Sequence, residues 1–95
     1  MIVPVNKNDT YKMLIKLDEK KIEKESQYSI EDIENAIKRA CGSINILYNN
    51  GFYTCNEYES VMAILSSISN REWIFRYIKE WNLYDSSGMV EDLLA

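Results

Sequence analysis

The chain has 95 residues, a net charge of −4 and no histidine. This length allows one domain over residues 1–95 with a single modest core, in which residues 1–9 and 86–95 are expected to fray. No apolar run is long enough to span a membrane, and residues 1–5 are too short and lack the basic residues of a secretory signal. We therefore expect a cytoplasmic protein without membrane contact.

The excess negative charge lies in the C-terminal part of the chain. Residues 1–55 contain eight Lys/Arg and eight Asp/Glu, whereas residues 56–95 contain three and seven. Nucleic-acid binding needs clustered cations that displace counterions, so this distribution argues against general nucleic-acid binding. An acidic surface can instead attract a basic groove on another protein.

Residues 11–17 alternate between apolar and polar side chains, which predicts a half-buried strand. A helix is the alternative, because Tyr11, Leu14, Ile15 and Ile22 also lie at helical spacing. Residues 18–27 alternate Lys and Glu around the single apolar Ile22, a pattern typical of a solvated turn or short extension.

Residues 29–42 carry the clearest local signals in the chain. Ser29 and Asp32 resemble a capping box, Tyr28 can pack on Ile33 as a hydrophobic staple, and Gly42 can supply a left-handed C-cap. An apolar stripe with helical spacing follows the cap: Ile30, Ile33, Ile37, Ala40 and Cys41. Together these features predict an amphipathic helix.

Residues 44–55 predict a β-hairpin. Asn50-Gly51 between β-forming residues is the strongest short hairpin signal, because a type I′ turn needs positive φ at both central positions. A two-residue loop places Asn49 opposite Phe52, Tyr48 opposite Tyr53, and Ile46 opposite Cys55. One face of this hairpin then carries Ile44, Ile46, Tyr48, Tyr53 and Cys55.

The C-terminal part predicts two helices and a short tail. Asn56 with Glu59, and Ser69 with Glu72, have the spacing of helix caps. The first apolar stripe is Tyr58, Val61, Met62, Leu65 and Ile68; the second is Trp73, Ile74, Tyr77, Ile78 and Trp81. The stripes point in different directions, which predicts a break near Ser69-Asn70. Residues 89–95 are expected to be a short amphipathic tail.

The predicted order is β-α-β-β-α-α. This order indicates an α+β domain in which the helices pack on one face of a small antiparallel sheet.

The sequence offers little for catalysis or for a cofactor. Histidine is missing, and no phosphate-binding, zinc-protease or nucleophile-elbow motif is present. Cys41 and Cys55 are not spaced as metal ligands, and both fall on predicted buried faces, so we expect reduced core thiols, with a disulfide as the alternative. We therefore expect neither an enzyme nor a cofactor.

The last predicted helix supplies candidate partner-binding residues. Phe75 projects away from the stripe that contains Trp73, and aromatic residues and Arg are the usual energetic anchors of interfaces. The alternative is that Phe75 packs against the preceding helix. The candidate contact residues are Phe75, Arg76, Lys79, Glu80, Tyr84 and Asp85.

Three stretches resemble small uncharacterised proteins of phages and other mobile elements of low-GC bacteria: residues 17–22, residues 28–37, and Glu72-Trp73 with residues 81–85. That resemblance implies a protein that binds and inhibits a host protein or nucleoprotein effector, as anti-CRISPR inhibitors do. The alternative is a self-associating accessory or regulatory protein of a mobile element, for which a homodimer is expected.

Overall fold

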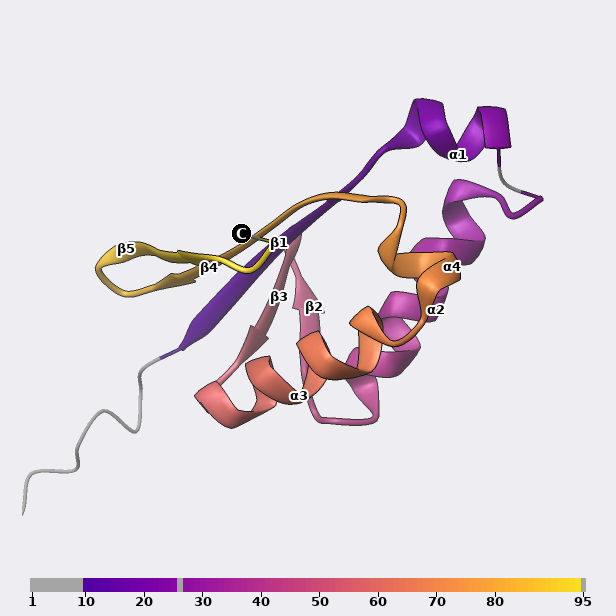
Figure 1. The fold of residues 1–95 in the computed structure, drawn as a ribbon. Helices are drawn as coiled ribbons and strands as arrows, with labels where there is room; N and C mark the ends of the chain where they lie inside the picture. Colours follow the sequence, from indigo (N-terminus) through magenta and orange to yellow (C-terminus); the bar gives the residue numbers. More distant parts are fainter. Residues whose placement is uncertain (1–9, 26, 95) are drawn as a thin grey trace, which may run out of the picture.

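The computed structural model describes residues 10–25 and 27–94, so the fraying expected at residues 1–9 lies outside the described part. An antiparallel sheet with the strand order β2-β3-β1-β4-β5 forms one layer (Figure 1). The elements along the described chain are β1 (Tyr11–Leu17), α1 (Glu19–Glu25), α2 (Ile30–Gly42), β2 (Leu47–Asn49), β3 (Phe52–Cys55), α3 (Tyr58–Ser69), α4 (Glu72–Phe75), β4 (Ile78–Asp85) and β5 (Gly88–Asp92). The α+β class is confirmed. The connectivity is that of a split βαβ fold with one added strand, an architecture that does not specify a function.

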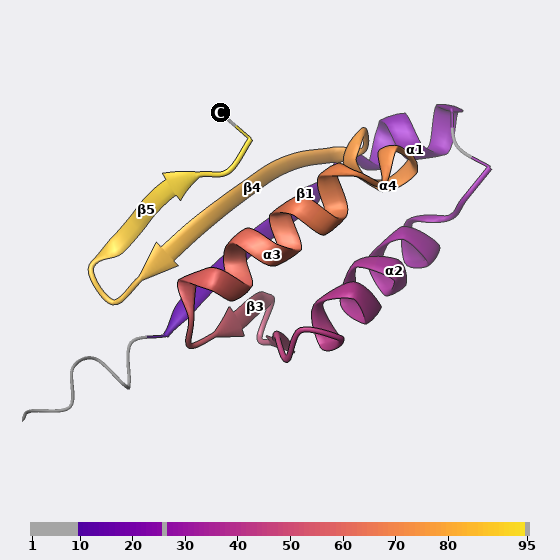
Figure 2. The same ribbon diagram turned by 60° about the horizontal axis from the view of Figure 1, so that its bottom comes forward.

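The core lies between one face of the sheet and the helices α2, α3 and α4 (Figure 2). Met13 on the central strand β1 is opposite Leu83 of β4, and both are fully buried. The helices bury Ile33 and Ile37 from α2 and Ile64 from α3 against this face. Residues 11–17 form the strand β1, as their alternation predicted, and the helical alternative is wrong.

Helix α2 begins as predicted. The Ser29 hydroxyl accepts from the Asp32 amide at 3.0 Å, and the Asp32 carboxylate accepts from the Ser29 amide at 3.1 Å. The predicted left-handed cap at Gly42 is wrong, because Gly42 is the last residue of the helix and Asn45 takes the positive φ of 63° instead. The Ile46 amide then donates to the Cys41 carbonyl at 2.9 Å and closes the helix end.

Residues 19–25 form the helix α1, which corrects the expected turn. The Asp18 carboxylate accepts from the Lys21 amide at 3.1 Å, so Asp18 caps the first turn. Ile22 is 1% exposed and fixes the helix to the core, while the Lys and Glu side chains around it remain largely in solvent. The buried Ile22 and the Asp18 cap thus help to order a run that is otherwise charged.

The hairpin register is confirmed at Tyr48 opposite Tyr53 and Asn49 opposite Phe52. Asn50 and Gly51 have φ values of 52° and 86°, as a type I′ turn requires. Strand β2 begins only at Leu47, so Ile46 is buried just before the strand and does not pair within it. Tyr48 is 50% exposed, although its ring lies 4.8 Å from that of Tyr53.

We expect Gly51→Val to lower the free energy of unfolding by about 1 kcal/mol or more, because a β-branched residue resists positive φ. A Cβ at Gly51 would meet no atom within 4 Å, so the loss would come from the backbone alone. Gly42→Ala is the matched control: Gly42 has equal space and lies in a helix, where Ala is favoured by about 1 kcal/mol. Thermal melting measures both, and an unchanged melting temperature for Gly51→Val would contradict the turn assignment.

The prediction of a long last helix is wrong beyond Phe75. The break after Ser69 is confirmed, but α4 has a single turn and residues 78–85 form β4 beside β1. Neither predicted cap operates, because the N-caps are Glu57 and Arg71 and neither side chain makes a capping hydrogen bond. Within β4, Trp81 and Leu83 alternate toward the core and Asn82 lies between them, as in a strand.

The expected C-terminal tail forms the strand β5. The Asp85 carboxylate accepts from the Ser87 amide at 2.7 Å and from its hydroxyl at 2.6 Å, and these donors hold the pKa of Asp85 below its ordinary value. Gly88 follows with a φ of 120°. The chain then returns along β4, and the Leu93 amide donates to the Trp81 carbonyl at 2.8 Å.

Cys41 and Cys55 are free, buried thiols, as predicted. Burial, and to a lesser degree the neighbouring Cys55, raise the pKa of Cys41 from 9.0 to about 12. Burial also raises the pKa values of Cys55 and Tyr53. All three groups are therefore held in their neutral forms by the fold.

Alkaline pH is expected to destabilise the protein through these groups. The folded chain holds the Cys41 proton more tightly than the unfolded chain, so this stability is complete below about pH 9 and is lost as the pH rises toward about 12. Denaturant titrations across this window should show the decline. Cys41→Ala should flatten it in part, because Cys55 and Tyr53 still titrate; an identical decline in the variant would exclude a contribution from Cys41.

Candidate protein-binding site

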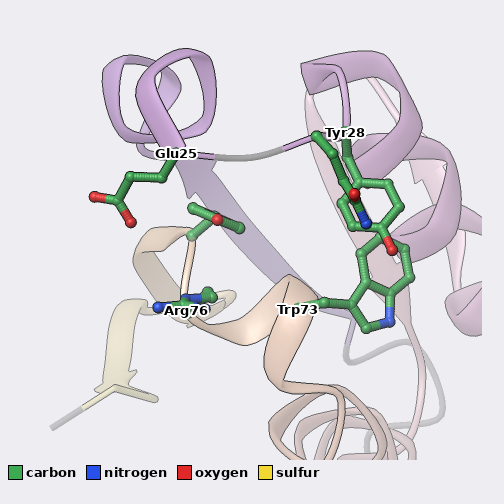
Figure 3. Close-up of a pocket in the computed structure, with 6 residues that line it drawn as sticks. Glu25, Tyr28, Trp73 and Arg76 are labelled. Carbon is green, nitrogen blue, oxygen red and sulfur yellow. The ribbon is translucent and has the colours of Figure 1, made fainter.

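A hollow of about 230 Å³ lies where the end of α1, the start of α2 and the end of α4 meet (Figure 3). Its lining residues are Glu25, Gln27, Tyr28, Trp73, Arg76 and Tyr77. They reach it because α1 packs beside α2 and because the chain turns out of α4 at Arg76. Small-molecule sites usually enclose about 300–1,000 Å³, so this hollow suits one side chain of a partner better than a cofactor.

The aromatic wall of the hollow consists of Tyr28 and Trp73. Their ring centroids are 4.6 Å apart with an interplanar angle of 40°, and Figure 3 shows the two rings side by side. Tyr28 is 36% exposed and Trp73 is 37% exposed. Trp73 was predicted to lie in the core, and that prediction is wrong because α4 presents Ile74 to the core instead.

The opposite wall carries charge. The Arg76 guanidinium lies 5.6 Å from the Tyr77 ring centroid, and the Lys21 ammonium lies 5.9 Å from the same centroid. Lys21 also donates to the Arg76 carbonyl at 3.3 Å, which ties α1 to the end of α4. Figure 3 shows Glu25 and Arg76 on the side away from Trp73. The hollow thus offers aromatic faces, a cation and a carboxylate to one bound group.

The structure distributes the six sequence-predicted contact residues over several places, and only Arg76 lines the hollow. Phe75 is half-buried and packs against the core. Lys79 lines a separate hollow with residues 17–20. Glu80 and Tyr84 lie on strand β4, where the Glu80 carboxylate is 4.0 Å from the Lys16 ammonium. Asp85 closes the turn after that strand.

Sequence reasoning missed Tyr28 and Trp73 as surface residues. Each had a structural interpretation, Tyr28 as a staple and Trp73 as a core residue. The usable signal was Arg76, because a charged residue three positions after Trp73 lies on the same side of a helix and could have marked that side as the surface.

No model of a known protein family matches this chain, and no curated protein matches it. Within residues 10–25 and 27–94, no helix is long and apolar enough to cross a membrane. The same part of the chain has no group of three or more His, Cys, Asp or Glu that could hold a metal ion.

Proposed function

We propose that the protein is a cytoplasmic protein-binding module that acts stoichiometrically, by occupying the surface of an effector, without catalysis. The observation that carries this proposal is the exposed Tyr28–Trp73 pair beside Arg76. Trp, Tyr and Arg are the residue types that dominate binding energy in interfaces.

The hollow supports a protein partner rather than a small molecule. One protruding side chain could stack on Tyr28 and Trp73, while its polar end meets Arg76 or Glu25. The surrounding surface would then exclude water around this central contact, as in other interfaces. The acidic C-terminal part would add attraction to a basic partner surface and speed the encounter.

The resemblance to small phage and mobile-element proteins narrows the proposed role. We propose that the bound partner is a host defence protein or nucleoprotein effector, and that binding blocks it in the manner of an anti-CRISPR inhibitor. The partner contacts this chain through protein, because the net charge of −4 disfavours direct contact with nucleic acid.

Affinity capture from a host lysate tests this proposal. Immobilised wild-type protein should retain a partner that Trp73→Ala loses, and nuclease treatment should leave the capture intact. Tyr48→Ala is the matched control, because Tyr48 is an exposed aromatic residue that does not line the hollow. Equal capture by wild type and Trp73→Ala would exclude the hollow as the binding site.

A further inference from the structure

The outer face of the sheet, opposite the helix layer, carries a second candidate surface. The cross-strand pairs place five residues in one row across all five strands: Leu47, Thr54, Lys12, Tyr84 and Met89. Leu47 and Met89, at the two ends of this row, are 67% and 61% exposed. Figures 1 and 2 show α2, α3 and α4 on the other side of the sheet, so no helix of the described chain covers this row.

The centre of this outer face is a packed apolar platform. The Phe52 and Tyr84 rings meet edge to face with centroids 6.2 Å apart, and the Lys12 ammonium lies 5.7 Å from the Phe52 centroid. Leu14 lies on the same face of β1 as Lys12, opposite Asn82 of β4. Each strand thus contributes an apolar residue to one continuous surface.

The charges of the outer face balance. The register places four charged residues on this face: Lys12 and Lys16 of β1, Glu80 of β4 and Asp92 of β5. The chain as a whole has a net charge of −4. Two copies of an acidic protein repel each other least where their surfaces carry no net charge, and both signs are present here for mutual pairing.

We infer that the outer sheet face is an interface between two copies of this chain. Two sheets can pack face to face with aligned strands, which makes a helix–sheet–sheet–helix dimer. Pairing through the sheet edges is disfavoured, because β2 has only three residues and β5 carries a register shift opposite Leu83/Tyr84. A single-stranded nucleic acid is disfavoured by the two carboxylates on the face.

This inference goes beyond the proposed function. The hollow is built by α1, α2 and α4 in the helix layer, so a dimer through the sheet leaves both hollows accessible. A dimer would therefore present two partner-binding sites at once, which raises the apparent affinity for a partner with repeated surfaces.

Sedimentation equilibrium of the full 95-residue chain tests the dimer. At about 100 μM, wild-type protein should have the mass of a dimer, and Leu47→Lys/Met89→Lys should be largely monomeric, with a Kd raised at least about a hundredfold. Ala63→Lys/Ser66→Lys is the matched control: it changes the net charge equally on the exposed side of α3 and should remain dimeric. Trp73→Ala should also remain dimeric, which separates this test from that of the hollow.

A dilution series of wild-type protein followed by amide NMR shifts needs no variant. Amide shifts that change with concentration should belong to residues of the outer sheet face and not to residues of α2 or α3. A wild-type monomer at about 100 μM, or a dimer unaffected by Leu47→Lys/Met89→Lys, would overturn the inference. Binding of a labelled oligothymidylate to monomeric wild-type protein would also overturn it, in favour of a nucleic-acid platform.

Discussion

Trp81→Ala is expected to leave the protein largely unfolded. Trp81 is fully buried at the centre of the sheet, opposite Ile15 of β1. Removing a buried Trp side chain costs about 3–5 kcal/mol, which approaches the whole stability of a domain of this size. Far-UV circular dichroism near room temperature should show an unfolded chain, and thermal melting should show no cooperative transition.

Trp81→Phe separates packing from hydrogen bonding at the same position. The Trp81 indole N–H donates to the Met13 sulfur at 3.2 Å, a contact within the core. Phe keeps most of the ring but removes the donor, and the thioether it leaves is only a weak acceptor. We therefore expect Trp81→Phe to fold with a moderately lower melting temperature. A Trp81→Ala variant that melts near the wild type would show that Trp81 is not the centre of the core.

Trp73→Ala should have the opposite effect, with a preserved fold and lost binding. Trp73 is 37% exposed and contacts Tyr28 at the surface, so its removal leaves no internal cavity. Truncation of a central interface Trp typically costs about 2 kcal/mol or more, which weakens binding at least about tenfold. Titration calorimetry with the captured partner measures this loss, and melting should stay within a few degrees of the wild type.

Phe75→Ala is the structural control for this experiment. Phe75 lies two residues from Trp73 but packs against the core, so its truncation should lower the melting temperature. Its folded fraction should bind with nearly unchanged affinity. An unfolded Trp73→Ala variant would mean that Trp73 supports the fold. A folded Trp73→Ala variant with unchanged affinity would place the binding site elsewhere.

The elements that the sequence predicted well are those specified by local contacts. Ser29 and Asp32 cap α2 three residues apart, and Asn50-Gly51 forms the two-residue turn that matches the hairpin register. Such signals act within one turn, so sequence spacing describes them fully.

The elements that were missed depend on distant partners. Residues 73–81 have helical spacing over two turns, yet β1 recruits residues 78–85 into the sheet, and pairing along the central strand outweighs local propensity. The prediction of the site failed for the same reason. Arg76 lines the hollow because the helix stops beside it, and Tyr28 reaches Trp73 only once α2 and α4 are packed together.

The pairing of β1 with β4 also determines when the protein can fold during its synthesis. Met13 and Trp81 are 68 residues apart, so the middle of the sheet closes only after nearly the whole described chain has left the ribosome. Until then β1 has no β4 beside it, whereas α2 and the β2–β3 hairpin can form early from local contacts. Before β4 is synthesised, β1 can pair only with β3, through residues 11–13, so the rest of β1 stays exposed, and in that interval a chaperone would protect it from aggregation.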